Sequence, residues 1–169
     1  MHPVITRAVS RLLARVPALG RVWGRWAHIV VRRDVPWAPM TRPIQLCRVT
    51  LITTGGIHLS TDRPFDMTNP RGDPSFRGVP VTTPVKDLAI THDYYDHRDA
   101  DLDPNIVFPL ERFRELARAG RLGRLTPTHW SFMGHITGHL VEELETTHIP
   151  ALLANLRREQ PDFAFLTPA

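Results

Sequence analysis

RVTLITTGGIH, residues 48–58, is the stretch that decides the fold. Residues 48–54 are β-branched or apolar almost throughout, and Gly55-Gly56 ends the run. This pattern is typical of a strand covered on both faces, as in a parallel sheet. The two glycines would let the backbone approach a ligand closely and would offer free N–H groups to an anion. From these residues alone, two interpretations stay open: the floor of a functional site, or a tight turn whose His58 only bonds the backbone.

Further strands and helices are predicted to alternate along the rest of the chain. A helix begins at Pro109 and stops at Gly120, and a second helical pattern over 137–158 has a break near Pro150. Residues 58–84 are rich in Pro, Gly and Asp and are expected to form a long loop. Strands alternating with helices indicate an α/β fold with a mostly parallel sheet, of the three-layer Rossmann-like kind. Short strands are predicted at 87–91, 122–126 and 163–167, while 131–136 is open between strand and loop.

The first 33 residues differ in charge from everything that follows. They hold seven of the 21 basic residues and no acid, which leaves 14 basic against 17 acidic residues in the remainder. Helical spacing places their apolar side chains on one face and their arginines on the other, so an amphipathic leader helix is predicted at 1–33. A proline-rich connector at 34–46 and an α/β domain at 47–169 are predicted to follow it. The helix is expected to pack on the domain or a partner subunit, with contact to a membrane surface as the less favoured alternative. Because the body is net acidic, no nucleic-acid partner is predicted.

The single cysteine, Cys47, excludes an internal disulfide framework and fits a reducing compartment. No apolar run approaches the length of a membrane-spanning helix, so a cytoplasmic protein is expected. Cys47 directly precedes the central strand and is predicted to be a buried small side chain rather than a catalytic thiol.

Polar side chains that could carry chemistry follow the strand predicted at 87–91. They can make contacts to a polar substrate or transfer protons, and they are His92, Tyr94, Asp96 and His97. The run also resembles the His-x-His-x-Asp-His signature of metallo-β-lactamases, except that Tyr94 stands where that signature has a histidine ligand. No metal site is therefore predicted, and a metal-dependent hydrolase using His92, Asp96, His97 and His58 is kept as an alternative.

A third histidine-containing stretch, HWSFMGH, covers 129–135, and His139 follows one helical turn later. His135 and His139 have the i, i+4 spacing of two metal ligands, but the Glu of a zincin motif is missing. The mixture of aromatic, Met and Gly residues favours a packed junction between a strand and a helix.

Taken in order, these segments resemble one family, the selenoprotein B components of the glycine, sarcosine, betaine and D-proline reductases. The resemblance covers residues 37–168, nearly all of the chain outside its arginine-rich leader. Each motif is modest alone, and their order makes the resemblance specific. The matching stretches are 37–43 (WAPMTRP), 47–66 (CRVTLITTGGIHLSTDRPFD), 72–77 (GDPSFR), 90–101 (ITHDYYDHRDAD), 105–116 (NIVFPLERFREL), 131–134 (SFMG) and 166–168 (LTP).

The resemblance implies an oxidoreductase that reductively cleaves a carbon–nitrogen bond in a small amino-acid-like substrate, with a thiol or selenol as nucleophile. It also implies a thioredoxin-type dithiol donor or other reductase subunits as partners. The four candidates of the 91–97 loop would then supply polar and proton-transfer groups. The residues that would frame the substrate pocket are Thr53, Thr54, Gly55, Gly56 and His58.

The redox-active residue that such an activity needs is not visible in the chain, and no other cofactor is identified. In longer relatives the chain continues past the Leu-Thr-Pro strand into a segment that carries a cysteine or selenocysteine. We therefore expect that residue beyond Ala169, with a selenocysteine codon read as a stop. The alternative is a natural half-protein that binds a substrate or partner without catalysis.

We predict that the codon directly after Ala169 is TGA and that an open frame follows it, encoding a Cys-His segment and a helix. Sequencing the gene together with its downstream DNA tests this expectation. A TAA or TAG codon with no frame behind it would contradict it.

Overall fold

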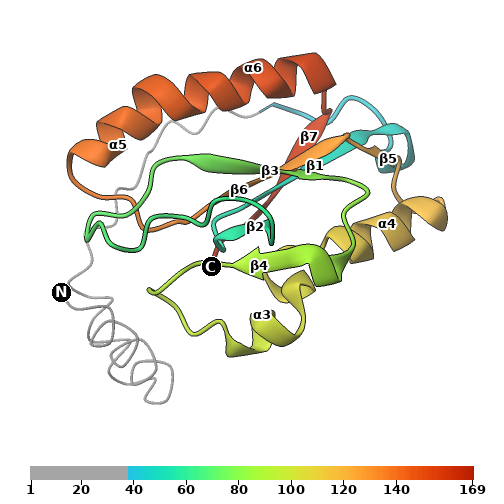
Figure 1. The fold of residues 1–169 in the computed structure, drawn as a ribbon. Helices are drawn as coiled ribbons and strands as arrows, with labels where there is room; N and C mark the ends of the chain where they lie inside the picture. Colours follow the sequence, from blue (N-terminus) through green and yellow to red (C-terminus); the bar gives the residue numbers. More distant parts are fainter. Residues whose placement is uncertain (1–37) are drawn as a thin grey trace, which may run out of the picture.

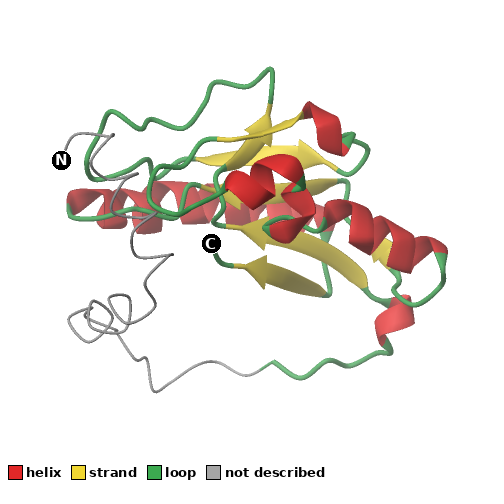
Figure 2. Ribbon diagram, turned by 90° about the horizontal axis from the view of Figure 1, so that it is seen from below, coloured by secondary structure: helices red, strands yellow, loops and turns green. Residues whose placement is uncertain are grey.

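The computed structural model describes residues 38–169, and the amphipathic helix predicted at 1–33 lies outside them. The described part is an α/β fold in which helices lie on both faces of a five-stranded sheet (Figures 1 and 2). A 3-10 turn, η1 (Ile44–Leu46), leads into the first strand.

The central strand of the sheet is β1 (Arg48–Thr53). It pairs in parallel with three strands, which are β5 (Arg124–Leu125) at its start, β6 (Thr128–Phe132) at its end, and β7 (Phe163–Thr167) along most of its length. The fifth strand, β3 (Phe76–Pro80), pairs antiparallel with β6. The sheet is therefore mixed and mostly parallel, and the predicted central strand, the final strand and the α/β class are confirmed.

One helical run covers the first face of the sheet (Figure 1). It consists of α5 (His139–Glu143), a π-helical turn η4 (Leu144–His148) and α6 (Ile149–Glu159). Leu152 of α6 packs against Trp130 and Phe132 of β6. The irregularity predicted near Pro150 is this π-helical turn, and the helix continues because Pro150 lies in the first turn of α6, where a proline is tolerated.

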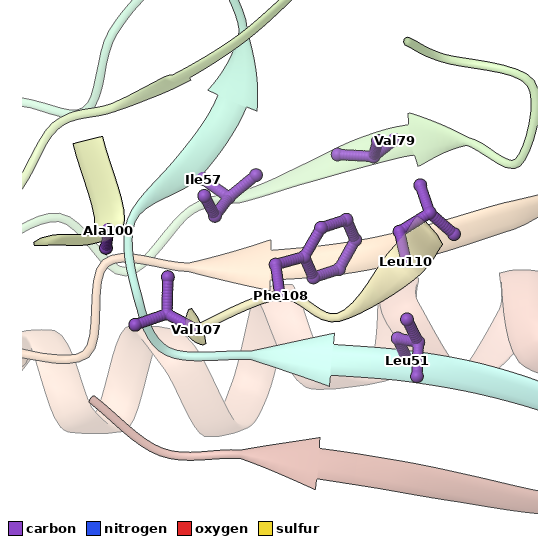
Figure 3. Packing of buried hydrophobic residues seen from close by; sticks show 7 residues of the cluster. All are labelled: Leu51, Ile57, Val79, Ala100, Val107, Phe108 and Leu110. Atoms are coloured by element: carbon purple, nitrogen blue, oxygen red, sulfur yellow. The ribbon is translucent and has the colours of Figure 1, made fainter. Parts of the chain in front are cut away.

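The opposite face carries α4 (Leu110–Arg118), the short α3 (Arg98–Leu102) and the 3-10 turn η3 (Pro104–Ile106). The predicted helix between Pro109 and Gly120 is thus confirmed. Figure 3 shows the core beneath it, where Val107, Phe108 and Leu110 meet Leu51 of β1 and Val79 of β3. All of these side chains are buried.

One expectation about the strands is wrong, and another is confirmed in a second, smaller sheet. Residues 58–84 do not form a continuous loop, because they contain β3 and most of β2 (Ile57–Leu59). A sequence containing Gly78 and Pro80 does not read as a strand, yet β3 lies outermost in its sheet, where both residues are tolerated. The strand predicted at 87–91, β4 (Leu88–Ile90), follows the 3-10 turn η2 (Val85–Asp87) and pairs antiparallel with β2 in a separate two-stranded sheet.

A buried histidine bridges a gap in the main sheet. β5 and β6 pair with the two ends of β1 and leave Leu51 between them. The N–H of Leu51 donates to Nδ1 of His129 at 3.0 Å, in place of a backbone carbonyl of a neighbouring strand. His129 is fully buried, and its burial, followed by the charge of Arg114, lowers its pKa to about 4. The ring is therefore neutral at pH 7, with Nδ1 free to accept.

We predict that His129→Leu lowers the free energy of unfolding by about 1–3 kcal/mol, because the buried Leu51 N–H loses its acceptor. His129→Asn is the matched control, since its Oδ1 can take the place of Nδ1 as acceptor. Equilibrium unfolding in urea compares the two variants. Equal losses would show that the hydrogen bond does not matter.

Candidate functional site

The carboxyl ends of three parallel strands meet at one edge of the sheet. The N–H of Thr54, just after β1, donates to the carbonyl of Thr167 in β7 at 3.1 Å. The N–H of Gly56 donates to the carbonyl of Phe132 at the end of β6 at 2.9 Å. This edge is where open α/β sheets bind their ligands. It is therefore the candidate functional site.

The turn after β1 does not offer free N–H groups, contrary to expectation. Besides the two amides already described, the N–H of Gly55 donates to the hydroxyl of Thr53 at 3.0 Å. That hydroxyl in turn donates to the carbonyl of Val107 at 2.8 Å. The turn cannot hold an anion through these amides, because each already has a partner within the protein. We therefore interpret the turn as a rigid backbone surface at the base of the candidate site.

Close backbone contacts explain why glycines occupy this edge. Gly56 has φ +70°, and a Cβ on it would lie 2.5 Å from the carbonyl oxygen of Thr91. Gly134, after β6, has φ +85°, and a Cβ there would lie 2.7 Å from the carbonyl oxygen of Thr54. The ends of β1, β6 and β4 are thus packed backbone to backbone.

His58 lies on β2 and is buried. One ring nitrogen is 2.7 Å from the carbonyl of Leu59 and the other is 2.8 Å from the hydroxyl of Thr91. Both nitrogens therefore have partners inside the β2–β4 sheet. This geometry gives His58 a supporting position beside the turn.

His92 is the buried histidine at the candidate site. Its Nδ1 accepts a hydrogen bond from the N–H of Tyr94 at 3.0 Å, so the neutral ring carries its proton on Nε2. Burial is the main cause that lowers its pKa to about 4, and the nearby His97 and His135 add to the shift. A hydrogen bond with the Met133 backbone acts in the opposite direction. At pH 7 the ring is neutral and holds the end of β4 against the end of β6.

Tyr94 and His135 form a stacked pair at this edge. Their ring centroids are 3.7 Å apart and their planes differ by 15°. The Tyr94 hydroxyl and the His135 Nε2 both lie near the carbonyl of Pro70, at 3.5 and 3.3 Å. Burial, followed by the charge of Asp93, raises the pKa of Tyr94, so its hydroxyl is protonated at pH 7. Both side chains are half-buried, which leaves part of the stack open to a ligand.

Asp96 and His97, the other two predicted catalytic residues, have partners on α3. Asp96 accepts two hydrogen bonds from Arg98, at 2.8 and 2.6 Å. His97 Nδ1 lies 2.8 Å from a carboxylate oxygen of Asp101. His97 also lies beside Tyr95, with ring centroids 5.5 Å apart, and Tyr95 in turn contacts His92. Asp96 and His97 therefore form the outer border of the site.

Two further residues belong to the site and were not predicted. The Tyr95 hydroxyl donates to the carbonyl of Gly55 at 3.0 Å, and burial raises its pKa. His135 had been assigned to a packed strand–helix junction and instead stacks on Tyr94. The sequence feature that could have identified these two residues is that each follows the end of a strand. Only the strand order, with β6 beside β1, shows that those ends are neighbours.

Within residues 38–169, no three His, Cys, Asp or Glu side chains converge as metal ligands would. The three histidines and the one carboxylate of the hydrolase alternative have the separate partners described above. The described part of the chain also contains no helix with the length and apolarity to cross a membrane.

Buried neutral histidines predict a stability loss in mild acid. His92 and His129 have pKa values of about 4 in the folded protein against 6.5 when exposed, so the unfolded chain binds more protons between these values. We expect the free energy of unfolding to be level above pH 7 and to fall as pH drops from about 6.5 towards 4. Urea unfolding at pH 7 and pH 5 measures the change. NMR titration of His92 is the direct check, and a pKa near 6.5 would contradict the buried geometry.

Comparison with known proteins identifies the family of this chain. The model of the family described as glycine/sarcosine/betaine reductase selenoprotein B matches residues 4–155. D-proline reductase subunit gamma of Acetoanaerobium sticklandii is 32% identical over 131 residues, which are 78% of this chain and 52% of that protein. The chain thus spans about half the length of this curated relative, and no solved structure matches it. The chain belongs to the glycine/sarcosine/betaine reductase selenoprotein B family.

Proposed function

We propose that this chain is a component of a reductase that cleaves the carbon–nitrogen bond of a small amino-acid-like substrate. Its contribution is the substrate-binding edge formed by the Thr53–Gly56 turn and the Tyr94–His135 stack. Family membership supports the reaction class. The main support for placing the substrate at this edge is that three strand ends meet there and that glycines line it.

The side chains at this edge suit a small amine. Aromatic rings attract a cationic ammonium group over their faces, and the Tyr94–His135 stack provides such a surface. His92 is neutral, so it adds no repelling positive charge. The Tyr94 hydroxyl is protonated at pH 7 and can donate a proton or a hydrogen bond to the leaving nitrogen.

The nucleophile of the proposed reaction is not Cys47. This thiol is fully buried at the start of β1, and its Sγ lies 3.4 Å from the carbonyl of Pro43. The candidate site lies beyond the opposite end of the same strand. We therefore assign the nucleophile to a cysteine or selenocysteine outside the described residues, in a further segment or another subunit.

The electrons in this scheme come from a dithiol partner. The thiolate or selenolate attacks the substrate carbon, a carbon–chalcogen bond forms, and the amine leaves with a proton. One thiolate of the partner then attacks the chalcogen, which releases the reduced and protonated product and leaves a mixed disulfide or selenosulfide. The second thiolate resolves this bond, so that the dithiol becomes a disulfide and the nucleophile is restored. The relative is called a subunit, which supports an assembly with other reductase subunits.

A second candidate function is a binding subunit that supplies no nucleophile of its own. The burial of Cys47 favours it, because the candidate site then holds a substrate for chemistry carried by a partner. The two candidates share the same binding edge. They differ in whether a redox-active residue belongs to the same polypeptide.

Binding of glycine, sarcosine, betaine and D-proline, followed by NMR of the purified chain, tests the site. We expect at least one of them to shift the amide signals of Gly134 and His135. Tyr94→Leu should weaken that binding about fivefold or more, because the aromatic surface is lost. His139→Ala is the matched control, since His139 is exposed on α5 nearby.

Two results would contradict the proposed site. In the first, none of the four compounds perturbs residues at this edge. In the second, Tyr94→Leu binds as tightly as His139→Ala while both variants retain the unfolding midpoint of the unmodified chain.

A further inference from the structure

A cavity of about 600 Å³ lies at the start of the parallel strands, away from the candidate site. The segment after β3, one face of α4, and β5 line it. The cavity is widely open to solvent, and its volume is within the range of small-molecule sites. The charged and apolar side chains in this lining are Arg114, Arg118, Arg124, Val81, Ala117 and Leu125.

Three arginines supply the positive charge of this cavity. Arg114 donates to the carbonyls of Val81 and Thr83, at 2.7 and 2.6 Å, and these carry no net charge. In the described part of the chain, no ion pair involves Arg114, Arg118 or Arg124. Burial and then the charge of Arg118 lower the pKa of Arg114, while Glu111 acts in the opposite direction. Like charges therefore face one cavity, and none of them forms an ion pair within the described residues.

The fold holds these groups in place. Arg114, Ala117 and Arg118 have the i, i+3, i+4 spacing that puts them on one face of α4. The two hydrogen bonds of Arg114 anchor that face to the segment after β3. Arg124 and Leu125 enter from β5, which is fixed by its pairing with Arg48 and Val49.

We propose that this cavity binds a small organic dianion, such as a phosphate monoester, with its charged oxygens on Arg118 and Arg124. Guanidinium groups bind phosphate and carboxylate oxygens through paired hydrogen bonds, which a dianion satisfies best. The apolar part of the ligand packs against Val81, Ala117 and Leu125. This combination selects an anion with an apolar body over an inorganic ion of the same charge.

This cavity and the candidate substrate site are at opposite ends of β1. Six residues of strand separate them, or about 20 Å. A ligand here cannot contact the Tyr94–His135 stack. The cavity is therefore a second site, and it does not depend on the proposed reductase function.

Calorimetric titration with phenyl phosphate and with inorganic phosphate tests the proposal. The titrations are done at a pH well above the second pKa of both acids, where both probes are dianions and only the first has an apolar body. We expect phenyl phosphate to bind the unmodified chain more tightly, to weaken as salt is raised, and to shift the amide signals of Gly123 and Leu125 in NMR spectra. The double variant R118Q/R124Q should weaken binding about tenfold or more.

R112Q is the matched control, because Arg112 lies on the same helix and pairs with Glu115 at 3.0 Å. It should leave the affinity for phenyl phosphate unchanged. Arg118 and Arg124 are exposed, so the double variant should keep its unfolding midpoint, and the midpoint is measured to verify this. The proposal is overturned if phenyl phosphate does not bind, if it binds no better than inorganic phosphate, or if both variants bind it equally.

Discussion

The constraint on which the structure depends is the lack of space around the backbone where β1 ends. Gly56 and Gly134 have no room for a Cβ because carbonyl oxygens of neighbouring segments occupy that position. Hydrogen bonds from the turn to β6 and β7 hold this contact together. The Thr53 hydroxyl adds a third tie, to the loop before α4. A larger residue at either glycine would separate the strand ends that make up the candidate site.

Histidines in this protein act first as hydrogen-bonding joints. His129 closes the gap between two short strands, His92 bonds the Met133 backbone just after β6, and His58 joins β2 to Thr91. His92 and His129 accept hydrogen bonds through Nδ1, which an imidazole can do only while it is neutral, and their burial ensures this by disfavouring the charged form. Polar residues that look catalytic in the sequence are therefore partly structural. The partly open Tyr94–His135 pair is the better candidate for substrate contact.

How far the sequence predicts this structure depends on whether a feature is local. The β1 pattern, the helix after Pro109 and the final strand are set by their own residues, and all three were predictable. The strand β3 was not, because its Gly and Pro are tolerated only through its outermost position. The pairing of Tyr94 with His135 was not predictable either, since it needs the order of strands in the sheet. The turn itself was predictable, but the N–H groups of Thr54 and Gly56 have partners that lie far along the chain.

The positions of Cys47 and Thr54 at the two ends of β1 limit what this chain can do alone. A strand of six residues holds its ends about 20 Å apart, and β1 is fixed along its length by parallel neighbours. Cys47 cannot cross that distance without dismantling the sheet, and its side chain is fully buried. Reductive chemistry at the glycine-lined edge therefore requires a thiol or selenol brought there by other residues. In the proposed scheme, the candidate binding surface at the end of β1 is therefore separate from the reactive atom.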